Sequence, residues 1–471
     1  MEKLSDDYQT NVEKMRTDLR VAENFDIIAR RLPVGKDEMT LFYVDGFVKD
    51  GVMQRLMQYF IGLDGLCGEA AEPCRRFADA YVPYVEVDVS ADAEFLRMMV
   101  LSGATVMLGS TFGSEAVIID TRTYPARDTQ EPESDRVMQG ARDGFVETLI
   151  FNTALIRRRL RDESLTMHYL TVGGSSRTDV VVCYMKGRAD EGYVTELCER
   201  IRAAAPTDLT MGTRSLLETL IRRRWYNPLP KVRTTERPDA AAAELLEGRV
   251  LVLCDTSPHV MVLPTSIFDF MQETDDYYFP PLTGCYLRLI RHFVFFTSLF
   301  ITPLWYLLVM HPDAIPPALL FLLPQEASAV PLLLQLFLVE LAVDGLKLAS
   351  MNTPDMLSGS LSVIGGLILS DFAVQVGWLT PEVILYTAFT AIAGFTQQNA
   401  ELGYAFKFMR MLILGLTALL DIWGFAAGLL VVLLLLLTNP TLNGRHSYLY
   451  PLIPFNGRAL GRLFLRLKKR S

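Results

Sequence analysis

Hydrophobic and polar positions follow different patterns before and after residue 281. In residues 1–280, short apolar runs that alternate with polar residues are interspersed with stretches of helical spacing. After residue 281, the apolar runs become long enough to cross a membrane as helices. The pattern predicts an α/β (α+β) N-terminal region, followed by an all-α polytopic membrane domain.

Two soluble subdomains are expected in the N-terminal region, at residues 1–160 and 161–280. In the first, strand-like runs lie at 39–48, 84–89, 104–109 and 115–120, and helix-like runs at 52–63, 95–103 and 145–161. In the second, strand-like runs lie at 165–174, 179–185 and 249–255, and a helix-like run at 193–204. An Ala-rich helix is also expected there, with Asp239 as its N-cap and Gly248 as its stop.

The transmembrane domain is expected at residues 281–440, with about four spanning helices and one re-entrant segment. The runs predicted to span are 293–310, 331–350, 383–395 and 411–438. The Gly- and Ser-rich run 357–378, which contains Gly359 and is interrupted by Asp371, is predicted to be re-entrant. Six crossings result if the last run is bent into two.

Charge predicts the orientation of these helices. Arg288 and Arg291 precede the first span, and the loop after it has two acids and no Lys or Arg, so the arginine side is expected in the cytoplasm. A basic tail is expected at residues 441–471 on the same side, in contact with membrane lipids. No apolar signal-peptide segment is recognised in the charged residues 1–23, so we expect the soluble region in the cytoplasm as well.

Charged side chains interrupt the run 331–350 in its apolar centre. Glu340, Asp344 and Lys347 are spaced to share one helical face, although an acid at mid-depth of a bilayer costs about 3 kcal/mol. Three interpretations remain open: an ion pair of Glu340 with Lys347 or Arg410, an acidic ring that lines a pore in an oligomer, and a helix that lies flat at the membrane surface. For Asp371 and Asp421, two of these interpretations remain open as well: an ion pair between helices, and a carboxylate that lines a pore.

Composition argues against several classes of protein. Residues 1–280 carry a net charge of about −12 and residues 281–471 about +3, and no basic stripe with interleaved aromatics predicts nucleic-acid binding. The sequence has no Walker, HExxH or GxSxG motif, and its five histidines are isolated. The six cysteines are scattered, which favours buried thiols over disulfides or zinc ligands. We therefore expect no enzyme activity, no cofactor and no metal site.

Several long stretches resemble one known family. They are EPESDRVMQGARDGFVETLIFNTALIRRRL (131–160), TERPDAAAAELLEGRVLVLCDTSPHVMVLP (235–264), VPLLLQLFLVELAVDGLKLA (330–349) and SVIGGLILSDFAVQVGWLTPEVILYTAFTAIAGF (362–395). Together they resemble the A subunits of spore germinant receptors, the GerA family, over about residues 25–455. ENFDIIARRL (23–32) and the region after residue 400 resemble a receptor-like paralogue more than an ordinary receptor subunit.

The resemblance implies a multi-pass protein of the inner spore membrane, with its soluble region on the cytoplasmic (core) side. It also implies a homo-oligomer that contacts other germination membrane proteins and forms an ion channel for ion release during germination. The pore-facing candidates are then Glu340, Asp344, Lys347 and the segment from Gly359 to Asp371. The alternatives are a non-conducting scaffold that docks receptor or channel subunits, and a proton-coupled transporter.

Overall fold

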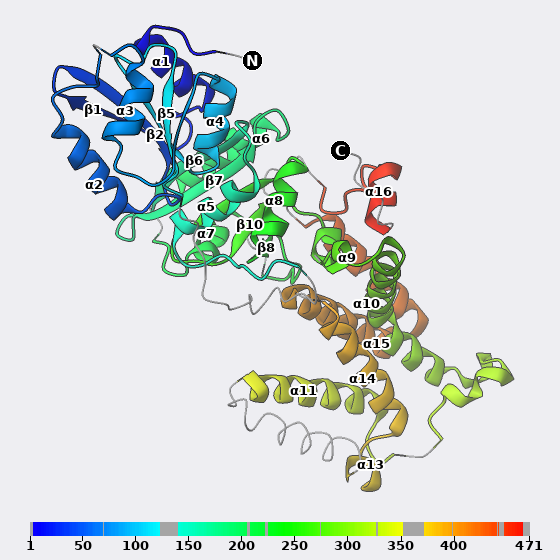
Figure 1. Cartoon of the computed structure of the whole chain (residues 1–471). Coiled ribbons are helices and arrows are strands. Elements are labelled where there is room, and N and C mark those ends of the chain that lie inside the picture. Colours follow the sequence, from blue (N-terminus) through cyan, green and yellow to red (C-terminus); the bar gives the residue numbers. More distant parts are fainter. Residues whose placement is uncertain are drawn as a thin grey trace. The chain divides into compact units, whose positions relative to one another are not determined.

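The computed structural model divides the chain into two compact units, Met1–Arg222 with Val232–Thr265, and Arg223–Lys231 with Ser266–Ser471. The first is an α/β unit and the second is helical (Figure 1). The structure describes residues 3–68, 70–122, 140–204, 208–221, 225–273, 275–325, 328–351, 372–397, 399–439, 441 and 447–464. Gly359, Asp371 and most of the predicted re-entrant run lie outside these residues.

The α/β unit contains two five-stranded antiparallel sheets. The first has the order β1-β2-β4-β5-β3, with helices α1 and α4 on one face and α2 and α3 on the other. Side chains along β2, β4 and β5 alternate between the two apolar cores, which is why these strands are buried on both faces. The elements are α1 (Tyr8–Asp18), β1 (Ile27–Val34), β2 (Asp37–Val44), α2 (Asp50–Ile61), α3 (Pro73–Tyr81), β3 (Val87–Ser90), α4 (Ala93–Leu101), β4 (Thr105–Gly109) and β5 (Ala116–Ile119).

The second sheet repeats the topology of the first. Its order is β6-β7-β9-β10-β8, and α5 and α8 share one apolar core with β6, β7, β9 and β10. The elements are α5 (Leu149–Arg159), β6 (Leu165–Val172), β7 (Thr178–Met185), α6 (Glu191–Ala203), α7 (Thr213–Leu220), β8 (Arg233–Thr235), α8 (Pro238–Leu246), β9 (Val250–Cys254) and β10 (Val260–Leu263). The same order of helices and strands therefore occurs twice in the unit.

Glycines at equivalent positions of the two repeats adopt the same backbone conformation. Gly46 (φ 81°) and Gly187 (φ 80°) each lie two residues after the second strand of their repeat. Gly103 (φ 98°) and Gly248 (φ 87°) each lie two residues after the helix that precedes the fourth strand. A positive φ is costly for residues with a Cβ, so both repeats need glycine at these turns.

Most strands and helices predicted in the N-terminal region are present. The strand-like runs at 104–109 and 115–120 are confirmed as β4 and β5, which pair antiparallel. The N-cap prediction is wrong, because Arg237 occupies the N-cap of α8 and Pro238 its first turn, a position that proline favours. The Asp239 carboxylate instead accepts a hydrogen bond from the Arg237 guanidinium at 2.7 Å. The sequence did not predict α1, β1, α3, α7, β8 or β10.

The glycine-rich turn between β6 and β7 is closed by a carboxylate of the chain itself. The backbone N–H groups of Ser175 and Ser176 donate to Asp208 Oδ1 at 2.7 and 3.0 Å. The Ser176 and Ser175 N–H groups hold the pKa of the Asp208 carboxyl below its ordinary value. These donors are thus already engaged within the protein.

A buried ion pair joins the two repeats. Arg157 on α5 is fully buried, and its Nε and Nη2 donate to the two oxygens of Asp26, just before β1, at 3.1 Å each. The same guanidinium donates from Nη1 to the backbone carbonyl of Leu165 at 3.2 Å. A bidentate pair of this kind sets both distance and orientation between the repeats.

Replacing Arg157 is expected to leave the Asp26 carboxylate buried without its cation. We predict that Arg157→Met lowers the free energy of unfolding of the α/β unit by about 3 kcal/mol. Urea unfolding of the full chain in detergent, followed by far-ultraviolet circular dichroism, measures this. The exposed neighbour Arg158 supplies the control, since Arg158→Met should cost less than about 1 kcal/mol. Equal losses from the two variants would contradict the prediction.

All six cysteines are free thiols, and four of them are buried. Burial raises the pKa of the Cys74 thiol and of the Cys254 thiol to about 12 each. We predict that Cys74 reacts with a maleimide at neutral pH at least about tenfold more slowly than the half-buried Cys67, because the thiolate is the nucleophile. Mass spectrometry of labelled peptides measures the rates, and labelling in denaturant should make them equal.

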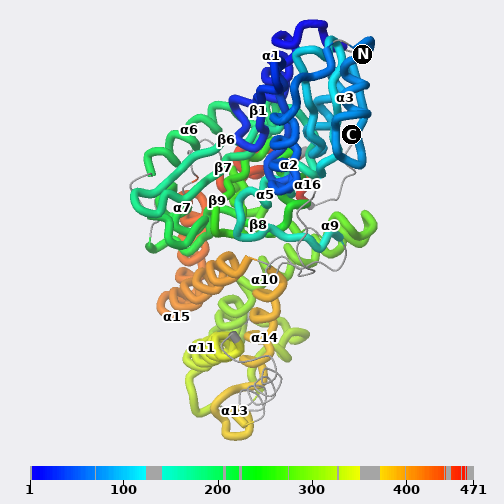
Figure 2. The backbone as a smooth tube through the Cα atoms, turned by 60° about the vertical axis from the view of Figure 1, so that its left-hand side comes forward, coloured from blue at the N-terminus to red at the C-terminus, as the bar shows by residue number. Residues whose placement is uncertain are grey.

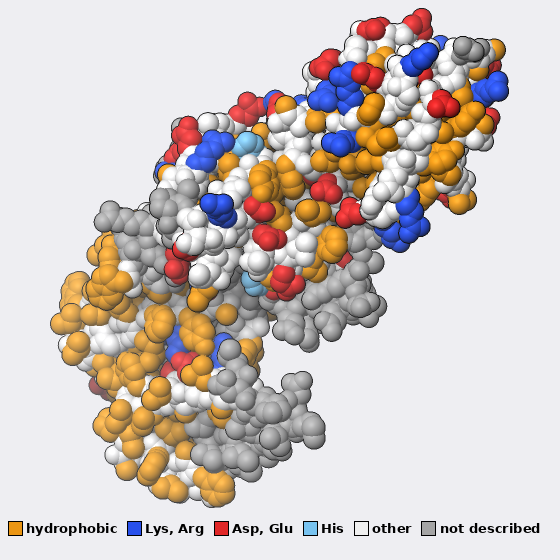
Figure 3. Space-filling view, turned by 90° about the vertical axis from the view of Figure 1, so that its left-hand side faces the viewer, with side chains coloured by type: hydrophobic (Ala, Val, Ile, Leu, Met, Phe, Trp, Pro, Cys, Tyr) orange, Lys and Arg blue, Asp and Glu red, His pale blue; other side chains and the backbone are white. Residues whose placement is uncertain are grey.

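All regular structure in the described part of the second unit is helical. Helix α10 packs against α14 and α15, and α11 packs against α14 (Figure 2). Hydrophobic side chains gather on the surface of this unit (Figure 3). The elements are η1 (Ile267–Met271), α9 (Asp275–Tyr278), α10 (Pro281–Met310), η2 (Pro312–Ala314), η3 (Pro317–Leu322), α11 (Leu332–Met351), α13 (Ala373–Gln375), α14 (Pro381–Phe395), α15 (Ala400–Leu437) and α16 (Gly457–Phe464).

By length and composition, two described helices, α10 and α15, are long and apolar enough to cross a membrane. Helix α14 is apolar but shorter. Helix α11 has 20 residues, as the sequence predicts, and carries three charged residues. The four-span arrangement therefore stays a prediction.

Helix α15 reverses direction at Asp421, whose φ of 58° and ψ of −136° break the helical path. A Cβ on Gly428 would lie 3.0 Å from the Cα of Ile413, although these residues would be about 22 Å apart in a straight helix. The helix is thus a hairpin with arms 400–420 and 422–437. The apolar run predicted as one span at 411–438 is bent, which is the alternative that the sequence left open.

The arginines expected to flank the first span lie inside α10. Arg288 Nε donates to Asp276 Oδ2 at 3.1 Å, and Arg291 Nη1 donates to the same oxygen at 3.0 Å. Arg288 is 1% exposed and Asp276 is fully buried. The helix begins at Pro281 rather than after the arginines, because these ion pairs compensate the charges within its first turns.

Candidate functional site

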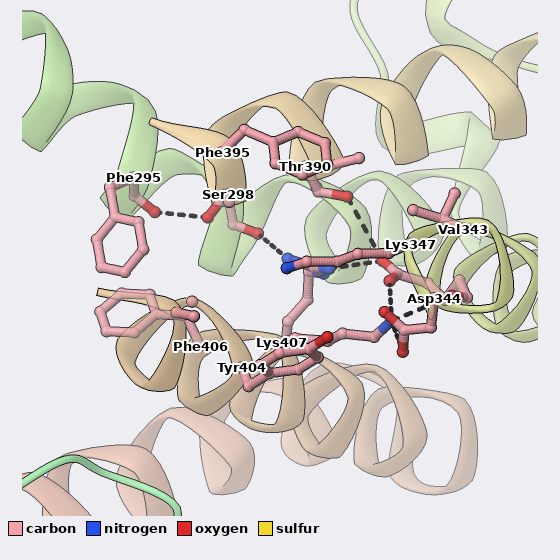
Figure 4. Close-up of a pocket in the computed structure, with 16 residues that line it drawn as sticks. Phe295, Ser298, Val343, Asp344, Lys347, Thr390, Phe395, Tyr404, Phe406 and Lys407 are labelled. Carbon is pink, nitrogen blue, oxygen red and sulfur yellow. Dashed lines mark hydrogen bonds and ion pairs between the residues drawn. The ribbon is translucent and has the colours of Figure 1, made fainter. Parts of the chain in front are cut away.

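The charged face of α11 borders a small cavity between α10, α11, α14 and α15 (Figure 4). Its volume is about 70 Å³, which is enough for water molecules or a small ion. Glu340, Asp344 and Lys347 all line it, as their shared helical face predicts. Aromatic and small residues complete the wall, among them Phe295, Phe395, Phe406, Gly394 and Gly403.

Glu340 lies at the centre of an ion-pair network. Its side chain is 8% exposed, and Arg410 Nη2 donates to its Oε1 at 2.5 Å. Lys407 Nζ lies 3.0 Å from Oε2, and the Thr390 hydroxyl donates to Oε1 at 3.4 Å. The structure therefore contains the Glu340–Arg410 pair, one of the alternatives proposed from the sequence.

Lys407 connects the two carboxylates of α11. Its Nζ lies 2.6 Å from Asp344 Oδ2 and donates to the Glu340 backbone carbonyl at 3.1 Å. Lys407 is not among the site residues predicted from the sequence, because it precedes the apolar run 411–438 that was predicted to span the membrane. Two cations three residues apart, Lys407 and Arg410, on one face of an apolar helix were the signal that could have identified it.

Lys347 interacts with aromatic rings. Its Nζ lies 4.7 Å from the ring centroid of Tyr404 and 5.5 Å from that of Phe395, within the range of cation–π attraction. Among the described residues that line the cavity, three cations thus face two carboxylates. Both carboxylates thus have cationic partners inside one chain, and the acidic ring in an oligomer stays a prediction.

The network also joins three helices. Arg410 on α15 binds Glu340 on α11 and donates from Nη1 to the Ser298 backbone carbonyl on α10 at 3.3 Å. Ser298 donates its own hydroxyl to the Phe295 carbonyl at 2.6 Å. Because several elements supply these contacts, only their packing assembles the site.

Asp421 lies apart from the cavity, at the reversal of α15. Its Oδ1 is 2.7 Å from His311 Nε2, which follows the C-terminus of α10. Both side chains are partly exposed. Within the residues that the structure describes, no cluster of three or more His, Cys, Asp or Glu side chains is arranged to hold a metal ion.

The fold and the site define a class of protein in which an α/β unit is joined to apolar helices that enclose a charged cluster. Residues 13–471 match the model of the Bacillus/Clostridium GerA spore germination protein family, and the chain belongs to this family. The resemblance inferred from its motifs is confirmed.

Relatives match almost the whole chain. It is 36% identical to stage V sporulation protein AF of Bacillus subtilis (strain 168), over 98% of this chain and 92% of that protein. It is 26% identical to the membrane protein YfkQ and 25% identical to spore germination protein KA, both of the same strain, over 94% of this chain in each case and 85% and 82% of those proteins. The N-terminal domain of the A subunit of the Bacillus megaterium spore germinant receptor GerK3 aligns at 19% identity, with a TM-score of 0.41, over 55% of this chain and 96% of that domain.

Removing one member of the central pair should destabilise the helical unit. We predict that Arg410→Met lowers the apparent melting temperature in detergent by about 5–10 °C, since Glu340 would remain buried without its main cation. Adding Glu340→Gln to Arg410→Met should recover part of this loss, because the unpaired charge is then gone. Asp313→Asn, in η2, is the control that removes an exposed carboxylate. Additive losses in the double variant would contradict the prediction.

Proposed function

We propose that this chain is a membrane component of the spore germination machinery that oligomerises and conducts ions when its charged cavity opens. The observation that carries the proposal is a cavity of about 70 Å³ among apolar helices, with the charged side chains of Glu340, Asp344 and Lys347 in its wall. Membership of the GerA family supports the link to germination. The proposal includes the inner spore membrane as location, the α/β unit on the cytoplasmic (core) side, and other germination membrane proteins as partners.

The ion pairs supply a physical mechanism for a closed state. Glu340 is held by Arg410 and Lys407, so its carboxylate is not available to a passing cation in this arrangement. Conduction requires α11 and α15 to separate, which exposes Glu340 and Asp344 to a hydrated path. Carboxylates that line such a path attract cations, and their repetition in an oligomer would strengthen the effect.

A non-conducting scaffold is the second candidate, and the same network favours it. Arg410 contacts α10 and α11 at once. A purely structural role, in which the charges hold the helices of one chain together, therefore also accounts for the network. The stoichiometry of the purified protein in detergent separates the two functions. A ring of identical subunits supports conduction, and a monomer that binds only other germination proteins supports the scaffold.

Ion flux tests the leading proposal. We expect the full chain, reconstituted in K⁺-loaded vesicles, to release K⁺, and we expect Glu340→Gln to change that flux by about tenfold because the charged group at the cavity is lost. A K⁺-sensitive electrode or dye measures the release. Asp313→Asn is the matched control outside the cavity and should conduct like the wild type.

Two results would contradict the proposal in different ways. A flux that Glu340→Gln leaves unchanged would remove this residue from the conduction path. Vesicles that contain the wild-type protein and release no K⁺ would show that the chain alone is not a channel.

A further inference from the structure

Residues 225–231 belong to the helical unit, although in sequence they lie between strands of the α/β unit. Asn227 Nδ2 donates to the Leu435 backbone carbonyl at 3.3 Å and to Asn439 Oδ1 at 3.2 Å. Leu229 is 3% exposed in the core shared with α10 and α15, and the Pro230 carbonyl accepts from the Tyr448 hydroxyl at 2.8 Å. The segment is therefore held by the end of the α15 hairpin.

Two aromatic side chains project from this anchored segment. Trp225 is 96% exposed and Tyr226 is 50% exposed, and their rings form an edge-to-face pair with centroids 6.1 Å apart. A fully exposed indole in water forgoes a large amount of apolar burial. Trp and Tyr are the residues enriched at the boundary between lipid and water, where the ring is buried and the polar atom stays hydrated.

The position of Asn227 determines how deep the rings of Trp225 and Tyr226 lie relative to the bilayer. It binds the last turn of arm 422–437, which is about 24 Å long and slightly shorter than the roughly 30 Å hydrocarbon core. The apolar run ends at Leu437 and is followed by Thr438 and Asn439. The buried amide pair of Asn227 and Asn439 marks the level at which polar groups replace apolar ones.

We propose that Trp225 and Tyr226 anchor the connection between the two units in the headgroup region of the bilayer. Their partner is the lipid surface, which accepts the apolar rings and hydrates the indole N–H and the phenol. The anchor would hold residues 225–231 at the membrane level, where the chain passes between the units. This inference rests on membrane placement of the helical unit, which is part of the proposed function, and does not depend on ion conduction.

Fluorescence quenching by lipids of known depth tests the anchor. The full chain is reconstituted in vesicles of phosphatidylcholine that carry a nitroxide at a shallow or a deep acyl position. The contribution of Trp225 is the quenching that is lost in Trp225→Phe. In the same way, Trp423→Phe gives the contribution of Trp423, which is 82% exposed at the opposite end of arm 422–437 and serves as the reference. Both replaced side chains are exposed, so neither change removes core packing, and buried Trp305 is kept.

We expect the shallow nitroxide to quench Trp225 at least about twofold more than the deep one, as for a ring at the headgroup boundary. Quenching of Trp423 together with no lipid quenching of Trp225 would overturn the anchor and leave the membrane placement intact. Quenching of neither tryptophan would overturn both the anchor and the membrane placement. Stronger quenching of Trp225 by the deep nitroxide would also overturn the interfacial position.

Discussion

The helical unit depends on compensating the charged groups that α11 carries among apolar neighbours. Glu340 is buried, and its isolated charge would cost several kcal/mol at this position, whereas the Asp344 side chain is 32% exposed. Arg410 and Lys407 offset this cost from α15, and Arg410 also reaches the backbone of α10. The positions of α10, α11 and α15 are consequently coupled through one set of charges, and a conformational change that moves one of these helices must break or exchange an ion pair.

A second buried pair has a comparable role in the α/β unit. Its two repeats share strand order, helix order and left-handed glycines, yet each has its own apolar cores. Arg157 and Asp26 join them through a bidentate contact that is specific in geometry. In both units, nonpolar side chains form the cores. Buried ion pairs then fix the positions of the repeats relative to each other in the α/β unit and of the helices in the helical unit.

The hydrophobic pattern predicted most elements but not their partners or their turns. Short continuous apolar runs identified β2, β4, β7 and β9, since strands buried on both faces consist largely of apolar residues. The α8 cap was misassigned because Asp239 is a common cap residue, whereas Pro238 at the start of the helix determined the boundary. The reversal of α15 was left open because an apolar run does not reveal a single residue with a positive φ inside it.

The sequence by itself determined the family, through several long motifs that occur in the same order. It also determined the division into an α/β and a helical region and the common face of Glu340, Asp344 and Lys347, because these depend on composition and on the periodicity of one helix. Only the tertiary structure decided that Arg410 and Lys407 compensate the carboxylates, that the same fold occurs twice in the first unit, and that residues 225–231 belong with the end of α15. Those contacts join residues 63 to 212 positions apart. Local periodicity carries no information about such pairs, which are selected by the packing of whole elements.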